Sequence, residues 1–213
     1  MKKSFLDYPG AVFDLDGTLT RSMHVWDRVC RDWLAARGKT PEADLEADIE
    51  AMTITQSADY VRRRYGIGLA SRKITAEWQD MVLDRYKTDV ALKEEVAALI
   101  PRFRERGAKL AVATSCFPAA CEAVLEKYGL RGSFAAILYT DEAPGDKGDP
   151  HIWRMAASRL ALAPEQCAAF EDSPRALAGA KSAGMAAAAV YDESCREWEL
   201  MKTLADWVLV PRE

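Results

Sequence analysis

The chain has 213 residues, of which 49% are hydrophobic and 29% charged, and its formal net charge is −4. This length suits one large domain or a core domain with a smaller insert, and the composition is ordinary for a globular protein. The negative balance argues against nucleic acids and anionic membranes as partners, because both are bound by basic surfaces.

Cysteine usage and the N-terminal region indicate where the protein works. The five cysteines are scattered and form no C-x-x-C pair, so they suggest reduced thiols and neither a zinc site nor a disulfide framework. No long apolar run follows the basic residues at the start of the chain, and we therefore expect no signal peptide and no membrane span. These features favour the cytoplasm.

The first predicted element is a short buried strand at Ala11–Phe13, which ends at two aspartates. Asp14 and Asp16 follow it directly, and Gly17 and Thr18 then turn the chain. A carboxylate at such a strand end lies at the edge of a parallel sheet where open α/β folds bind ligands. The alternatives are a plain Asp-Gly turn or a calcium loop, but a calcium loop would need a third acid and a later glutamate.

A purely helical segment follows this strand. Apolar residues recur there at helical spacing and no strand pattern is convincing. The predicted helices run from the capping residue Ser22 to Arg37, from Pro41 to about Ala51, from Ile54 to Tyr65 and through Ile74–Val82. We expect residues 21–88 to form an inserted all-helical cap domain, which leaves residues 1–20 and 89–213 as the core domain.

Strands and helices alternate in the rest of the chain. A long helix from Leu92 to Gly107, kinked at Pro101, comes first. Predicted strands follow at Leu110–Ala113, Ala135–Tyr139, Cys167–Phe170, Met185–Val190 and Trp207–Leu209. The predicted helices between them are Phe117–Tyr128, Pro150–Ala161 with Asp149 as its cap, Pro174–Ala183 with Ser173 as its cap, and Glu193–Thr203. The alternation predicts an α/β fold, a Rossmann-like parallel sheet with helices on both faces.

Further polar residues lie at or after the ends of three later strands. Each has an ordinary explanation when taken singly, as a helix cap or a solvated loop side chain. Because the carboxyl ends of parallel strands share one edge, we expect them to converge on Asp14 and Asp16. The residues are Thr114, Ser115, Lys147, Glu171 and Asp172. Together with Asp14 and Asp16 they supply carboxylates, hydroxyls and an ammonium. Phosphoryl transfer to a carboxylate in the presence of magnesium requires these groups.

The set resembles the four motifs of the haloacid dehalogenase superfamily, in the branch of β-phosphoglucomutase and phosphoglycolate phosphatase. The motifs match in order and spacing over essentially the whole core, and the helical insert resembles the cap of the first type in that family. The resemblance implies a magnesium-dependent phosphomonoester hydrolase of small phosphorylated metabolites.

The family also implies a role for each matching residue. Asp14 would be the nucleophile that forms an aspartyl-phosphate, and Asp16 the general acid and base. Thr114, Ser115 and Lys147 would bind the phosphoryl group. Magnesium would be held by Asp14, the main-chain carbonyl of Asp16 and Asp172. Glu171 would bind the ion through a water molecule or lie outside the groups that contact it.

Departures from the family pattern bear on the substrate. Arg21 stands where the family often has an acidic residue, and we expect either a solvated arginine or a contact to a second anionic group of the substrate. Lys147 is followed by Gly148 in place of the usual proline.

Two alternatives to a hydrolase are open. A phosphosugar mutase is disfavoured because Trp26 stands near the position of the mutase's cap histidine and residues 52–56 offer no arginine. A receiver-type signalling module is disfavoured by the position of the acidic pair and by the helical insert. We expect a monomer or a weak homodimer.

Overall fold

The structure is a computed structural model that describes residues 3–49, 52 and 54–211. It divides into two compact units, the larger formed by Met1–Ser22 and Val90–Glu213 and the smaller by Met23–Asp89. The divisions lie close to those expected after residues 20 and 88.

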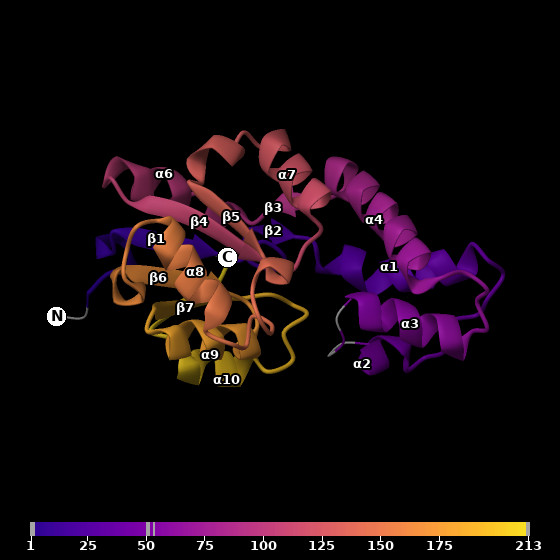
Figure 1. The fold of residues 1–213 in the computed structure, drawn as a ribbon. Coiled ribbons are helices and arrows are strands. Elements are labelled where there is room, and N and C mark those ends of the chain that lie inside the picture. Colours follow the sequence, from indigo (N-terminus) through magenta and orange to yellow (C-terminus); the bar gives the residue numbers. More distant parts are fainter. Residues whose placement is uncertain (1–2, 50–51, 53, 212–213) are drawn as a thin grey trace. The chain divides into compact units, whose positions relative to one another are not determined.

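The larger unit is built on a six-stranded parallel sheet (Figure 1). Its spatial order is β5-β4-β1-β6-β7-β8. The strands are β1 (Gly10–Phe13), β4 (Lys109–Thr114), β5 (Ala136–Tyr139), β6 (Cys167–Glu171), β7 (Ala186–Val190) and β8 (Trp207–Leu209). The predicted α/β fold is confirmed. The first strand in the chain lies inside the sheet, with Val12 opposite Ala111 of β4 and Ala169 of β6.

Helices cover both faces of this sheet, as the burial of β1 on both sides requires. Val12 belongs to a buried cluster with Trp153 and Ala156 of α8 (His151–Arg159). The next residue, Phe13, points to the opposite face, because side chains alternate along a strand. There its ring packs edge-on against Phe103 of α6 (Leu99–Glu105), with 6.0 Å between the ring centroids. The other helices of this unit are α7 (Pro118–Lys127), α9 (Pro174–Ala183) and α10 (Trp198–Leu204).

The smaller unit consists of helices around its own buried core. The helices are α1 (Met23–Ala35), α2 (Leu45–Ile49), α3 (Ile54–Arg64) and α4 (Ser71–Thr88), and the described residues of this unit contain no strand. Trp33 and Trp78 pack edge to face at its centre, with ring centroids 6.0 Å apart. The helix expected from Pro41 begins later, at Leu45, and its predicted end at residues 50–51 lies outside the described residues, as does residue 53.

The prediction of one long kinked helix after Leu92 is wrong. Leu92 belongs to β3 (Ala91–Leu92), which pairs antiparallel with β2 (Thr20–Arg21) where the chain leaves and re-enters the larger unit. Two short helices follow, α5 (Glu94–Ala97) and α6. Pro101 is the third residue of α6, in the first turn, where a main-chain N–H has no partner within the helix and its loss causes no kink.

Two predicted helix starts are also wrong. The helix expected from Glu193 begins at Trp198, because Asp192 Oδ1 accepts bonds from both the main chain and the hydroxyl of Ser194 and holds a turn. Asp149 does not cap α8, whose N-cap is Pro150. The Asp149 carboxylate instead accepts a bond from Asp146 N in the preceding loop, at 3.3 Å.

Candidate active site

Polar side chains gather where four neighbouring strands end. Asp14 follows β1 directly, Thr114 is the last residue of β4, and Glu171 is the last residue of β6. Lys147 lies in the loop that follows β5. Since β5, β4, β1 and β6 are neighbours in a parallel sheet, their carboxyl ends form one edge. The structure therefore places these residues at the edge where open α/β folds bind ligands.

Lys147 joins two of the carboxylates. Its Nζ lies 2.5 Å from Asp14 Oδ1, and it also forms an ion pair with Glu171. The second oxygen of Glu171 accepts bonds from the main-chain N–H groups of Asp172 and Ser173, both at 3.0 Å. Glu171 is thereby fixed at the end of β6, and Lys147 is held against the carboxylate of Asp14 although it comes from a loop.

Asp14, Glu171 and Asp172 form a buried acidic cluster. Each offers one carboxylate oxygen within 4.8 Å of the others. Burial raises the pKa of Asp14 to about 6, although Lys147 acts in the opposite direction. Burial, followed by the charges of Glu171 and Asp14, raises the pKa of Asp172.

The charges of this cluster do not balance. The Lys147 ammonium forms ion pairs with two of the three carboxylates, Asp14 and Glu171, and among the described residues no second lysine or arginine forms an ion pair with the cluster. Beyond it, the Thr18 hydroxyl donates a bond of 3.2 Å to Asp172 Oδ1. Buried charges need partners of opposite sign. A divalent cation with a preference for hard oxygen ligands fits this donor set.

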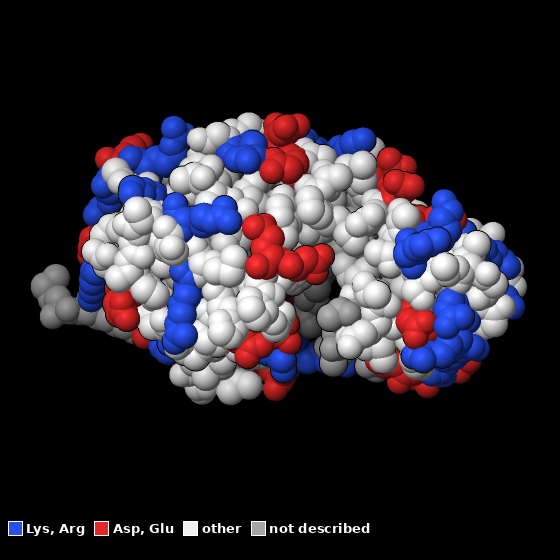
Figure 2. Space-filling view, viewed as in Figure 1, with Lys and Arg blue, Asp and Glu red and all other residues white. Residues whose placement is uncertain are grey.

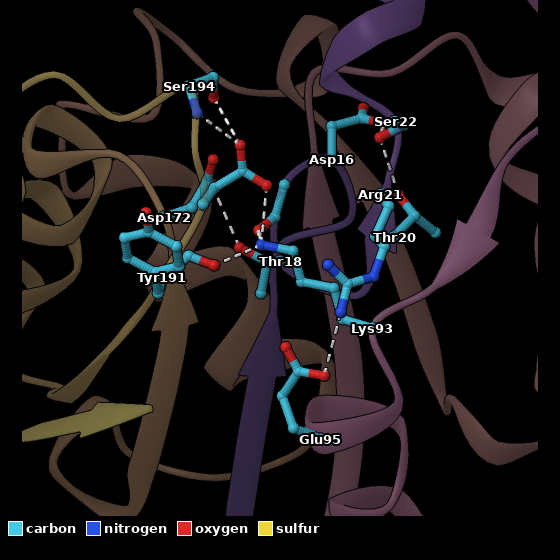
Figure 3. A network of polar contacts seen from close by, with 12 residues as sticks. Asp16, Thr18, Thr20, Arg21, Ser22, Lys93, Glu95, Asp172, Tyr191 and Ser194 are labelled. Atoms are coloured by element: carbon cyan, nitrogen blue, oxygen red, sulfur yellow. Dashed lines mark hydrogen bonds and ion pairs between the residues drawn. The ribbon is translucent and has the colours of Figure 1, made fainter. Parts of the chain in front are cut away.

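Asp16 has a different environment from Asp14. It is half-buried, and the hydroxyl of Ser22 donates a bond of 2.6 Å to its Oδ1 (Figure 3). The Thr20 hydroxyl lies 2.9 Å from the Ser22 hydroxyl and donates to the main-chain oxygen of Leu15, also at 2.9 Å. Sequence reasoning assigned Ser22 only to a helix cap and missed its contact with Asp16.

Three other residues predicted to belong to the site differ in position. Thr114 is fully buried, and its hydroxyl oxygen accepts a bond from Cys116 N at 3.0 Å. Ser115 is exposed. Arg21 Nη2 lies 3.6 Å from Glu95 Oε2. Figure 3 shows the Arg21 guanidinium directed toward the Glu95 carboxylate and not toward Asp16. The predicted substrate contact of Arg21 stays a prediction.

The loop that carries Lys147 is held by residues that sequence reasoning did not identify. The indole N–H of Trp153 donates to Lys147 O at 2.9 Å. Gly179, inside α9, lies very close to the main chain of this loop: a Cβ added at Gly179 would be 2.1 Å from Lys147 O. The sequence did contain a signal for this contact, because Gly179 lies in the middle of a predicted helix. A glycine there destabilises a helix by about 1 kcal/mol relative to alanine, which suggests that close packing requires it.

Comparison of this chain with known protein families identifies its family. A family model described as haloacid dehalogenase-like hydrolase matches residues 8–184. The chain belongs to this family. The resemblance inferred from the four motifs is thereby confirmed, and the protein is a hydrolase.

The proteins similar to this chain include phosphatases, and the similar solved structures include complexes with phosphate and with a sugar bisphosphate. Hexitol phosphatase B of Escherichia coli (strain K12) is 29% identical over 183 residues, covering 82% of this chain and 80% of that protein. Protein CbbY of Rhodobacter capsulatus is 28% identical over 213 residues, covering 95% of this chain and 92% of that protein. Crystal structures of CbbY from Rhodobacter sphaeroides with phosphate, and of a mutant with xylulose-(1,5)bisphosphate, have TM-scores of 0.83 and 0.82 at 25% identity. Each covers 95% of this chain and 93% of that one.

The surface carries charges of both signs. On the face shown in Figure 2, lysine and arginine side chains are interspersed with aspartate and glutamate. Within the part of the chain that the structure describes, no helix combines the length and the apolar character needed to cross a membrane.

Proposed function

We propose that this protein is a magnesium-dependent phosphomonoester hydrolase that works through an aspartyl-phosphate on Asp14. The observation that carries this proposal is the buried carboxylate of Asp14 beside the Lys147 ammonium, within a cluster that also contains Glu171 and Asp172. A carboxylate can attack phosphorus only if the negative charges of both groups are offset. Lys147 supplies one positive charge in this cluster, and the three carboxylates form a donor set that suits a divalent cation.

The reaction has two steps that share one proton-transfer group. In the first, a carboxylate oxygen of Asp14 bonds to phosphorus while the bond to the ester oxygen breaks, and Asp16 gives its proton to that leaving oxygen. In the second, Asp16 takes a proton from water as the water oxygen attacks the aspartyl-phosphate and frees Asp14. The bond from the Ser22 hydroxyl holds the Asp16 carboxylate in one orientation.

The other polar residues bind the transferring group. Lys147 offsets its charge, and the hydroxyls of Thr114 and Ser115 donate hydrogen bonds to its oxygens. Asp14, Asp172 and the main-chain carbonyl of Asp16 would hold Mg²⁺, with Glu171 bonding through water. When bound, the ion would supply positive charge that offsets the negative charges of the nucleophile and the phosphoryl group.

The substrate is a small phosphorylated metabolite, and a phosphorylated sugar or polyol is the class we favour. The names of the hexitol phosphatase and of the fructose-1-phosphate phosphatase of Escherichia coli support this choice. We propose that residues 21–88, which contain nearly all of the smaller helical unit, form the cap domain, and that residues 1–20 and 89–213 form the core. We further propose a cytoplasmic monomer or weak homodimer that binds neither nucleic acid nor membrane.

A panel of phosphorylated sugars, polyols and other metabolites tests the proposal. We expect phosphate release that requires Mg²⁺ and stops when EDTA is added. A phosphosugar that is isomerised without release of phosphate would favour the mutase alternative. No turnover of any phosphomonoester with Mg²⁺ would refute the proposed activity.

Asp14→Asn should abolish turnover and leave the fold intact. The amide is nearly isosteric, but it does not attack phosphorus and is a poorer ligand for magnesium. The control is Asp80→Asn, the same change at an exposed position of α4. Phosphate release by Asp14→Asn within tenfold of wild type contradicts the assignment of the nucleophile.

A further inference from the structure

Lys93 is a buried lysine that follows β3, where the chain re-enters the larger unit. It is 1% exposed, and its ammonium group has three acceptors. These are Gly17 O, Tyr191 O at 2.6 Å and Asp192 Oδ2 at 2.8 Å. An ammonium carries three N–H donors, so these acceptors satisfy it completely. Lysine is rarely buried without such pairing.

The Lys93 ammonium connects two loops that the sheet keeps apart. Gly17 lies in the loop after β1, whereas Tyr191 and Asp192 follow β7. Strand β6 lies between β1 and β7. Their ends are therefore two strand spacings apart, or about 10 Å. Figure 3 shows the long side chain of Lys93 reaching from its own segment to the main chain of Tyr191.

The loop held at Gly17 carries groups of the active site. It contains Asp16, and its Thr18 hydroxyl donates to Asp172 in the acidic cluster. Lys93 bonds this loop twice, because its main-chain N–H also donates to Leu19 O at 2.9 Å. Gly17 has a φ of +78°, a conformation that few other residues adopt, so the loop turns sharply at the point where the ammonium binds it.

A bond from a lysine to a main-chain oxygen is not by itself evidence for a role in the reaction. Lys109 also donates to a main-chain oxygen, Leu160 O at 2.8 Å, but it stands at the first residue of β4 and thus at the amino edge of the sheet. The two lysines differ in what they bind. Only the contacts of Lys93 reach the loop that carries Asp16.

We propose that Lys93 is a positioning residue of this phosphatase. Held by Asp192 and Tyr191, its ammonium fixes the Gly17 carbonyl and with it the loop that places Asp16 beside the leaving group. The role rests on the proposed function of Asp16 as general acid. Lys93 itself touches neither substrate nor metal.

Lys93→Met keeps an unbranched apolar side chain that is one atom shorter and removes the ammonium. We expect kcat for an alkyl phosphate to fall about 10- to 100-fold, the scale of a misplaced catalytic group. The fall should be several-fold smaller for an aryl phosphate, whose leaving oxygen needs less protonation. KM should change little, because Lys147 and its neighbours still bind the phosphoryl group. Lys109→Met is the control: it makes the same change at an exposed lysine that also bonds a main-chain oxygen, and it should leave the ratio of alkyl to aryl rates unchanged.

Asp192→Asn is a second variant that keeps Lys93 and the volume of the site. It should shift the alkyl-to-aryl ratio in the same direction by a smaller factor, and it tests the proposal if Lys93→Met does not fold. Equal losses for both phosphates in the variant that folds, or a ratio equal to that of Lys109→Met, would overturn the positioning role.

Amide hydrogen exchange separates this proposal from the proposed function. In the native structure the N–H groups of Gly17, Leu19 and Thr20 are bonded within the loop. Lys93→Met should speed their exchange, and Lys109→Met should not. If the wild type releases no phosphate from any substrate, the proposed function fails. Unchanged exchange at Gly17, Leu19 and Thr20 in Lys93→Met refutes the positioning role whatever the activity.

Discussion

Gly179→Ala tests how the Lys147 loop is held in place. An added Cβ would lie 2.1 Å from Lys147 O and 2.9 Å from the carbonyl carbon of Gly148. Both are main-chain atoms, so no change of side-chain rotamer relieves the clash. The loop must shift by roughly 1 Å to restore an ordinary contact distance.

The shift acts directly on the proposed phosphate-binding lysine. The main-chain oxygen of Lys147 accepts the bond from the Trp153 indole, and its Nζ lies 2.5 Å from Asp14. A displacement of about 1 Å of a positioning element can cost on the order of 10²-fold in rate. We therefore expect kcat/KM for the best substrate to fall about 100-fold.

Stability should change far less than activity. Overpacking costs about 1–3 kcal/mol. Replacing glycine by alanine inside a helix returns about 1 kcal/mol. The net loss of at most about 2 kcal/mol leaves a folded protein, and thermal unfolding measured beside the kinetics checks this.

Gly132→Ala is the matched control. It makes the same change in the same unit, where an added Cβ meets nothing within 4 Å. If kcat/KM of Gly179→Ala stays within threefold of both wild type and Gly132→Ala, the close approach of α9 does not position Lys147 and the reasoning fails.

Two further predictions concern the aspartates after β1. Asp16→Asn should lower kcat about 10²- to 10⁴-fold for an alkyl phosphate and less for an aryl phosphate, and equal losses would argue against its role as an acid. Because burial raises the pKa of Asp14 to about 6 despite the opposing effect of Lys147, the folded metal-free protein binds a proton there more tightly than the unfolded chain does. This contribution to stability is complete below the unfolded pKa of 3.8 and is lost as pH rises through about 6, so in EDTA the melting temperature of wild type relative to Asp14→Asn should fall between pH 4 and 7. A difference that stays constant over that range would contradict the raised pKa.

The sequence alone was sufficient for the fold class and for the expectation that Asp14, Thr114 and Glu171 lie at one edge of the sheet. Short apolar runs that end in Asp14, Thr114 or Glu171 predict strands with polar residues at their ends, and because parallel strands point the same way, those ends lie at one edge of the sheet. Both signals are local. Each depends on a few consecutive residues and on a general rule of topology, so no knowledge of distant contacts was needed.

The tertiary structure alone decided which residues hold the site in place. Lys93 falls in a segment predicted as helix and nothing in that pattern singled it out, yet its ammonium bonds Gly17 across 76 positions of the chain. Gly179 and Lys147 meet because α9 packs against the loop after β5, and Ser22 turns its hydroxyl to Asp16. Such contacts depend on strand order and on close packing between elements, and the pattern of residues along one segment contains no information about either.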